Sequence, residues 1–163
     1  EYAPFSFTTE ETGGIIGNGD ITMDWIVHVL KRTVDTQYRT KADRRHTFLA
    51  GSSMGGLMTL YGLLAYPEVF SRGAALSPSL WIDAEKVKAM IRHARVKRNT
   101  VLYMDYGALE FADHPHSRSL FAEVSALLIE KRVLLNSRIV PRGTHCEASW
   151  EKQIPFFMKT LFE

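Results

Sequence analysis

Residues 47–65 read TFLAGSSMGGLMTLYGLLA, and the fold can be worked out from this stretch. Residues 47–50 form a short apolar run that suits a buried strand, and the apolar residues 57–65 predict a helix that ends before Pro67. Between them lies the pattern G-x-S-x-G, centred on Ser53. The stretch therefore predicts a strand, a sharp turn and a helix, with Ser53 at the turn.

The chain on both sides alternates in the same way. Upstream, residues 8–19 are rich in Thr and Gly and predict a loop, and Asp20 is the predicted N-cap of a helix that ends near Gln37. Downstream we expect strands at 72–76, 101–104 and 137–140 and helices at 87–94, 120–128 and 150–161, with Pro155 either kinking the last helix or marking its true start. The alternation predicts an α/β fold, a parallel sheet with helices on both faces.

Composition excludes several classes of protein. A net charge of +2 over 163 residues argues against charge-driven binding to nucleic acid or to an anionic membrane. No apolar run approaches the length of a membrane span. The single cysteine, Cys146, excludes an internal disulfide and a Cys-rich zinc module, and it fits a reducing compartment, so a cytoplasmic location is the prediction.

Ser53 is the candidate nucleophile. A nucleophilic serine on a strand-to-helix turn needs small neighbours, and we expect Gly51 and Gly55 to provide that space. The backbone N–H of Met54 would then face the oxyanion of a tetrahedral intermediate. The neighbouring Ser52 lacks the flanking glycines.

His145 is the candidate base, because it follows the strand at 137–140 and should share the sheet edge of Ser53. The other five histidines are weaker candidates for the base: His28, His46, His93, His114 and His116. The last two form a His-Pro-His pair, at which we do not expect a metal site. Cys146, adjacent to His145, is interpreted as a small packing residue.

Three acids compete to orient His145, namely Asp105, Glu110 and Asp113. Asp105 lies on or near a strand, where the sheet edge can engage its side chain. Glu110 lies beyond Gly107, in a loop that can reach His145, and is placed first. The order serine, acid, histidine along the chain is that of the α/β-hydrolases.

These residues resemble a known family. Residues 47–83, which include the Tyr-Pro-Glu-Val-Phe turn and the Ser-Pro-Ser-Leu-Trp segment, are similar to the putative-esterase family of α/β-hydrolases. The family includes enterochelin esterases, S-formylglutathione hydrolase (esterase D), feruloyl esterases and mycolyltransferases. The likeness continues through residues 107–110 (GALE) and 143–145 (GTH) to Trp150.

The resemblance implies Ser53 as nucleophile, Glu110 as acid and His145 as base, with no metal or organic cofactor. Some members carry Asp at the acid position, and some siderophore esterases are thought to use only a Ser–His pair. The resemblance also implies that Trp81, just after the second predicted strand, lines the substrate pocket. A packed aromatic is the alternative for Trp81.

One departure from the family concerns the residues before Ser53. Family members have several earlier strands, and a loop among them supplies the first oxyanion amide near a His-Gly or Asp-Gly turn. Nothing similar precedes Ser53 here. We therefore expect residues 1–163 to be the C-terminal part of one α/β-hydrolase domain, in which a missing N-terminal segment or an oligomer partner covers the edge of the Ser53 strand.

The predicted function is that of a serine esterase, which hydrolyses small carboxylic esters through an acyl-enzyme on Ser53. Three alternatives stay open. The chain could be an acyltransferase, a thioesterase similar to S-formylglutathione hydrolase, or a non-catalytic binding domain on a hydrolase scaffold. The ester itself is not specified by the sequence.

Overall fold

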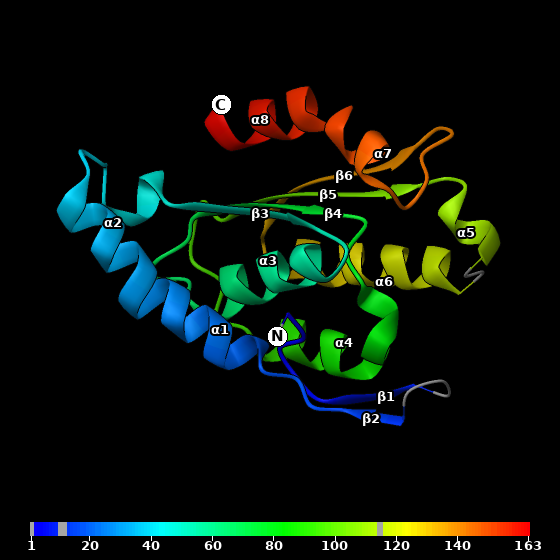
Figure 1. Ribbon diagram of the computed structural model, residues 1–163. Coiled ribbons are helices and arrows are strands. Elements are labelled where there is room, and N and C mark those ends of the chain that lie inside the picture. The colour runs from blue at the N-terminus through cyan, green and yellow to red at the C-terminus, as the bar shows by residue number, and fades with distance from the viewer. Residues whose placement is uncertain (1, 10–12, 114–115) are drawn as a thin grey trace.

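A four-stranded parallel sheet forms the centre of the computed structural model, which describes residues 2–9, 13–113 and 116–163 (Figure 1). The strands stand in the order in which they occur along the chain: β3 (Phe48–Ser52), β4 (Arg72–Leu76), β5 (Val101–Gly107) and β6 (Leu134–Val140). Every neighbouring pair is parallel. The predicted α/β class is confirmed, and β3 and β6 are the edges of this sheet in the described part of the chain.

Helices cover both faces of the sheet, as predicted (Figure 1). One face carries α3 (Met54–Ala65), α4 (Ala84–His93) and α6 (Ser117–Glu130), together with α1 (Gly19–Trp25). The other face carries α7 (Glu147–Glu151) and α8 (Ile154–Phe162). A large apolar cluster fills the first interface, and a smaller one, built on Ala74, Leu76, Tyr103 and Leu161, fills the second.

The helix predicted from Asp20 to Gln37 is present with a different start and an irregular middle. It begins at Gly19 after Asn18, so Asp20 lies in its first turn and is not the N-cap. A π-helical segment (Ile26–Leu30) joins α1 to α2 (Lys31–Gln37). Pro155 is the second residue of α8, where a missing N–H costs little, so it marks the start of that helix.

The loop predicted at 8–19 was wrong in part. A small antiparallel pair, β1 (Phe7–Thr9) and β2 (Gly13–Ile15), occupies part of it and lies beside α4, away from the sheet (Figure 1). No helix in the described ranges is both long and apolar enough to cross a lipid bilayer.

The register of the sheet brings the ends of the strands together. Ser52 pairs with Leu76, Leu76 with Asp105, and Asp105 with Arg138. Residues that follow these four positions therefore gather at the carboxyl ends of the strands, which is where functional side chains accumulate in parallel α/β folds.

Candidate active site

Ser53 lies on a strained turn between β3 and α3. Its φ of 54° and ψ of −121° are unfavourable for a residue with a side chain. Three backbone hydrogen bonds hold the turn: its N–H donates to the oxygen of Leu76 at 2.9 Å, and its carbonyl accepts from Leu57 and Ser79, both at 3.1 Å. Strain of about 1–3 kcal/mol persists only when the surroundings fix it in this way.

The glycines at this turn do not contribute equally. A Cβ on Gly51 would lie 2.5 Å from the carbonyl carbon and oxygen of Gly55, so Gly51 must be glycine. A Cβ on Gly56 would lie 3.0 Å from the oxygen of Leu76. A Cβ on Gly55 meets nothing within 4 Å in the described part of the chain. The expectation that both glycines provide space is therefore right for Gly51 and wrong for Gly55. At Gly55 the backbone lies close to Gly51, whereas a side chain would have room.

His145 joins Ser53 to Glu110. Its Nε2 lies 2.9 Å from Ser53 Oγ, and its Nδ1 lies 2.7 Å from Glu110 Oε2. The three side chains come from the ends of three strands, since Ser53 follows β3, Glu110 opens the short helix α5 (Glu110–Asp113) after β5, and His145 follows β6. The structure thus brings together the serine, acid and histidine that the sequence singles out, although 92 residues separate Ser53 from His145.

The carboxylate of Glu110 is buried and fully engaged. Its side chain is 5% exposed, whereas that of His145 is 42% exposed. Besides His145, it accepts hydrogen bonds at Oε1 from the Ser77 hydroxyl and from the Gly107 N–H, both at 2.7 Å. A buried carboxylate costs free energy unless such bonds satisfy it. These donors fix one oxygen and leave the other directed at His145.

Two glycines let the loops after β5 and β6 approach each other. A Cβ on Gly107 would lie 2.5 Å from the carbonyl carbon and oxygen of Gly143 and 2.6 Å from Glu110 Oε1. In the same region, Leu109 N donates to Gly143 O at 3.0 Å. This close contact is what allows Glu110 and His145, on different loops, to meet.

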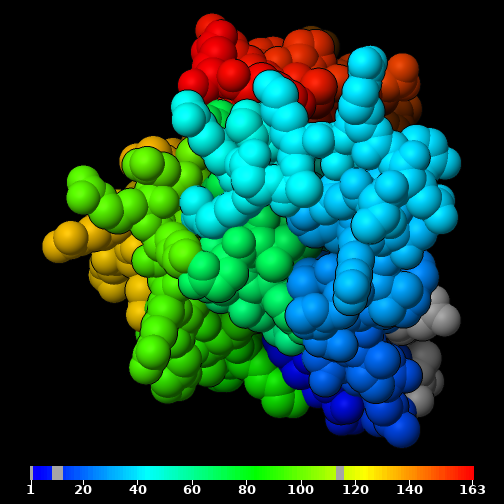
Figure 2. All heavy atoms as spheres, turned by 90° about the vertical axis from the view of Figure 1, so that its left-hand side faces the viewer, coloured from blue at the N-terminus to red at the C-terminus, as the bar shows by residue number. Residues whose placement is uncertain are grey.

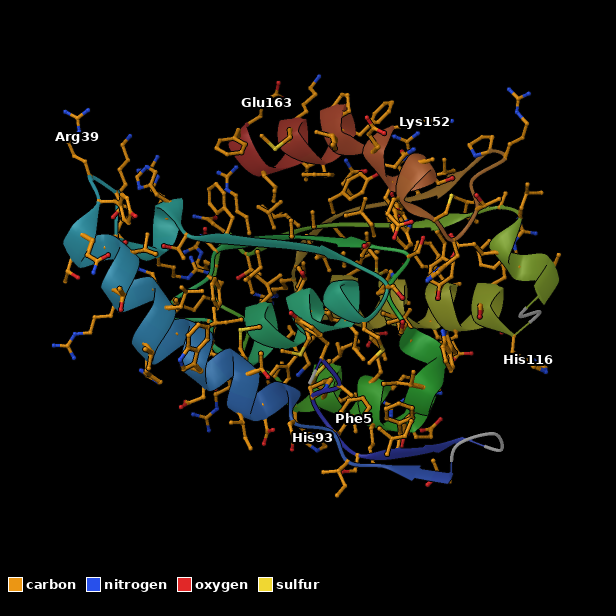
Figure 3. All side chains as sticks on the ribbon, in the orientation of Figure 1. Phe5, Arg39, His93, His116, Lys152 and Glu163 are labelled. Carbon is orange, nitrogen blue, oxygen red and sulfur yellow. The ribbon has the colours of Figure 1, made fainter. Side chains whose placement is uncertain are left out.

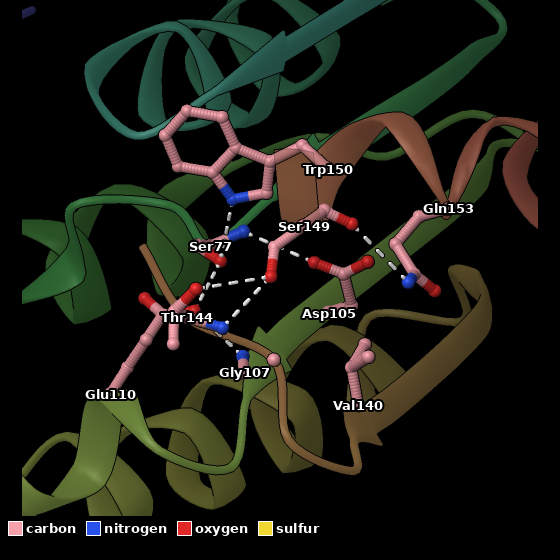
Figure 4. A pocket seen from close by; sticks show the side chains of 10 residues that line it. Ser77, Asp105, Gly107, Glu110, Val140, Thr144, Ser149, Trp150 and Gln153 are labelled. Atoms are coloured by element: carbon pink, nitrogen blue, oxygen red, sulfur yellow. Dashed lines mark hydrogen bonds between the residues drawn. The ribbon is translucent and has the colours of Figure 1, made fainter. Parts of the chain in front are cut away.

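Ser77 and Trp150 extend the network behind Glu110 (Figure 4). The indole Nε1 of Trp150 donates to Ser77 Oγ at 3.0 Å, so Ser77 accepts one bond while it donates another to Glu110. The ring of Trp150 also packs edge-on against His145, with centroids 5.0 Å apart. A cavity of about 10 Å³, at the lower limit for one water, lies among these groups.

Asp105 has a different set of partners from Glu110. It is 1% exposed, and its two oxygens accept from the Tyr103 hydroxyl at 2.7 Å and from the Ser77 N–H at 3.2 Å. Burial raises the pKa of its carboxyl above the usual range. The prediction that the sheet edge engages Asp105 is confirmed. Of the other acid candidate, Asp113, the side chain lies outside the described residues.

The remaining candidates, Met54, Trp81 and Cys146, lie near the carboxyl ends of the strands. Met54 is the first residue of α3, where backbone N–H groups have no partner within the helix. Trp81 is exposed, on a 3₁₀ turn (Leu80–Asp83) just after Ser79, whose Oγ lies 3.3 Å from Ser53 Oγ. Cys146 is half-buried, and a hydrogen bond with the Thr144 hydroxyl lowers the pKa of its thiol.

The other histidines are away from this constellation. His46 pairs with Asp43 at 2.8 Å and His28 with Asp24 at 3.3 Å, while His93 Nδ1 lies 2.8 Å from Ala89 O. His114 lies outside the described residues. No group of three or more His, Cys, Asp or Glu that could hold a metal occurs in the ranges the structure describes.

Sequence reasoning missed Ser77, Ser79 and the bond from Trp150. The signal available was the Ser-Pro-Ser segment that directly follows a predicted strand. Its position at the carboxyl end of β4 could have flagged both serines. Their partners depend on the register between β4 and β5, which a single sequence does not supply.

Comparisons with known proteins agree with this architecture. The family model described as "Putative esterase" matches residues 18–158. Iron(III) salmochelin esterase from Escherichia coli O6:H1 is 35% identical over 78 residues, which cover 47% of this chain and 19% of that protein.

Solved structures are similar over most of the chain. An IroE-like serine hydrolase from Shewanella oneidensis aligns with a TM-score of 0.75 and 20% identity, covering 98% of this chain and 54% of its own. The enterobactin esterase of Shigella flexneri aligns with a TM-score of 0.65 and 23% identity, covering 85% and 36%. The chain thus spans about half or less of the length of these relatives. With the family model matching most of its residues, the chain belongs to the family described as Putative esterase.

Proposed function

We propose that the protein is a serine hydrolase that cleaves carboxylic esters through an acyl-enzyme on Ser53. The observation that carries the proposal is the position of His145, which lies within hydrogen-bond distance of both Ser53 Oγ and Glu110 Oε2. A serine hydroxyl is a weak nucleophile until an adjacent base takes its proton. The family model and the esterase relatives support the same reaction class.

In the proposed reaction, Ser53 Oγ attacks the ester carbonyl carbon while its proton moves to His145 Nε2. The imidazolium keeps its Nδ1–H on Glu110 Oε2, which fixes the tautomer and stabilises the positive charge. Collapse of the tetrahedral intermediate breaks the bond to the alcohol, and the alcohol leaves with the proton from Nε2. A water molecule then repeats the sequence on the acyl-enzyme, releasing the acid and the Ser53 hydroxyl.

The negative oxygen of the intermediate needs donors. The Met54 N–H is the proposed donor from this turn, helped by the N-terminus of α3. In the family, a loop before the nucleophile strand supplies a second backbone N–H to the oxyanion. That such a segment does so in this protein stays a prediction. Losing one such donor typically lowers kcat by about 10²–10³-fold.

The direct test replaces Ser53 with alanine. We expect Ser53→Ala to lose labelling by a fluorophosphonate probe and at least about 10³-fold of its p-nitrophenyl acetate turnover, because the nucleophile is gone. Ser52→Ala is the matched control and should keep both signals. A Ser53→Ala protein that still labels and hydrolyses the ester would refute the assignment.

The substrate class is proposed from the relatives. Two of them are named for the siderophores salmochelin and enterobactin, so siderophore esters are the first substrates to test. Trp81, exposed beside the Ser53 edge, is the proposed aromatic wall for such a substrate. Turnover of siderophore esters above that of simple acetate esters, reduced in Trp81→Ala, would support both points.

Acyl transfer and thioester hydrolysis use the same three side chains. Products formed with an added alcohol acceptor separate a transferase from a hydrolase, and a thioester panel reveals a thioesterase. A binding domain without catalysis is a different class. It would show no reaction with any serine-directed probe even though His145 and Ser53 lie within hydrogen-bond distance.

A further inference from the structure

A second cleft lies at the opposite end of the sheet from Ser53, where the strands begin. The register aligns Phe48 with Arg72, Arg72 with Val101, and Val101 with Leu134 in one row. A cleft of about 650 Å³ opens beside this row, and its lining includes Arg44, Arg45, Arg72, Asn99, Leu134 and Thr160. We call it the amino-end cleft. Since β5 has seven residues, roughly 20 Å of strand separates it from the candidate active site.

Figure 2 views the molecule from this end. The cyan residues before β3, the red end of α8 and the green-to-gold turns before β5 and β6 meet on this face. A neighbouring cleft of about 590 Å³ shares Asn99 and Leu134 with the first and is lined by Lys97, Arg98, Lys131 and Arg132. Each volume is that of a small-molecule site.

Five of the chain's twelve arginines line the two clefts, and, like the other arginines of the described residues, they have no carboxylate partner. Within the described part of the chain, no carboxylate oxygen lies within 4 Å of a guanidinium of Arg44, Arg45, Arg72, Arg98 or Arg132. Lys97, in contrast, pairs with Glu68, and Lys131 donates to main-chain carbonyls. Glu163 is the carboxylate that also lines the amino-end cleft. Positive charge therefore exceeds negative charge on this face.

Two of these arginines are held in place by the fold. Arg44 Nε donates to Pro67 O at 2.5 Å and its Nη2 to Thr100 Oγ1 at 3.0 Å. Arg72 Nη1 donates to Leu161 O at 2.7 Å. A guanidinium has five donor hydrogens, so each keeps donors for a ligand in a side chain that has already lost its freedom.

A buried hydroxyl without a partner lies at the same place. Ser71 is 3% exposed and lines the amino-end cleft, and its Oγ has no hydrogen-bond partner in the described residues. Buried polar groups are rarely left unpaired in native proteins.

Arg132 occupies a position that favours glycine. It closes α6 with a φ of 63°, and the bonds from Arg132 N to Ile129 O and from Val133 N to Leu128 O form the usual C-terminal motif of a helix. An arginine here places a cation on the cleft at a conformational cost. A ligand bound by the Arg132 side chain would explain why an arginine, and not a glycine, occupies this position.

From these features we propose that the amino-end cleft and its neighbour bind a small molecule that carries two or more phosphate groups. Guanidinium forks match phosphate oxygens in geometry and charge. Several unpaired arginines over two adjoining clefts call for a ligand with more than one anionic group. The site is separate from the proposed esterase site.

The experiment measures binding of tripolyphosphate by calorimetry in physiological salt without divalent cations. We expect saturable binding to the unaltered chain, and roughly tenfold or more weaker binding for Arg45→Ala and for Arg132→Gly. Arg132→Gly should keep or raise the melting temperature, because glycine suits that backbone. A fall in melting temperature would mean that the arginine serves the fold, which overturns its assignment to a ligand.

Arg118→Ala is the matched control, since it removes the same charge from the other end of α6. That end of the helix follows His116, which is labelled in Figure 3. It should bind tripolyphosphate as the unaltered chain does. Absent binding, or equal weakening in all three variants, overturns the site. Citrate that binds as tightly as tripolyphosphate overturns the assignment to phosphate.

Discussion

At the scale of single residues, Ser77 shows how the candidate site depends on a side chain that lies behind Glu110. Its φ of 40° is unfavourable, yet its N–H, its hydroxyl proton and its hydroxyl oxygen are all engaged, with Asp105, Glu110 and Trp150 in turn. Such a residue positions Glu110, the proposed acid, through a network whose members support one another.

Removing the Ser77 hydroxyl tests this role. We expect Ser77→Ala to lower kcat by about tenfold with little change in KM, because Glu110 loses a hydrogen bond that orients it. Steady-state kinetics on p-nitrophenyl acetate measures both constants. Ser125→Ala is the matched control, since the Ser125 hydroxyl is buried but has no partner in the described ranges. A KM change at constant kcat would contradict a positioning role.

Asp105 makes stability depend on pH. Burial raises its pKa in the folded protein above the reference value of 3.8, so the folded state holds the proton more tightly than the unfolded state does. Its contribution to the free energy of unfolding is therefore largest below 3.8 and is lost as the pH rises through the raised pKa.

Asp105→Asn keeps the shape and removes the titration. We expect it to be as stable as the unaltered chain in acid and more stable at neutral pH, where the charged form is costly. Its amide can face Tyr103, whose hydroxyl has Gln153 Oε1 at 3.5 Å as another acceptor. Urea unfolding at the two pH values measures the difference. If Asp105→Asn changes the free energy of unfolding equally at the two pH values, the titration of Asp105 is not what makes stability depend on pH.

At the scale of elements, the turn from β3 to α3 depends more on Gly51 than on Gly55. Gly51→Ala should destabilise the chain by several kcal/mol or prevent folding, since a 2.5 Å contact with backbone cannot relax. Gly55→Ala should cost little, because its Cβ has room and alanine favours a helix. Thermal unfolding of the pair is the measurement. Equal losses in both variants would disprove the distinction.

Elements were predictable where local signals agree. Strand β4 has the predicted bounds, 72–76, because Ser-Pro ends an apolar run, and the Ser53 turn follows from its glycines. The pair β1 and β2 was missed because strands of three residues in a Thr- and Gly-rich stretch carry no periodicity. Glu110 could be placed ahead of Asp105 and Asp113 only by its position along the chain, because its contact with His145 depends on how two loops meet at Gly107 and Gly143.

At the scale of the whole molecule, the ends of the sheet have different chemistry. One end gathers a buried carboxylate, a histidine and a serine at the carboxyl ends of the strands, and the other gathers the five arginines that line the two clefts. This separation follows from the parallel topology, which points all strands the same way. The basic end could not be foreseen from a net charge of +2, because a sum hides how charges are distributed.

The parallel order of the strands also has a consequence for how the chain folds. No two neighbouring strands of the four-stranded sheet are joined by a hairpin, so each pairing must close a long loop before it gains energy, which makes such sheets slow to assemble. Ser53 meets His145 only after the segment behind β6 has docked. During refolding from urea, helical circular dichroism should therefore return before fluorophosphonate reactivity does, and the reactive serine becomes a reporter of the last step.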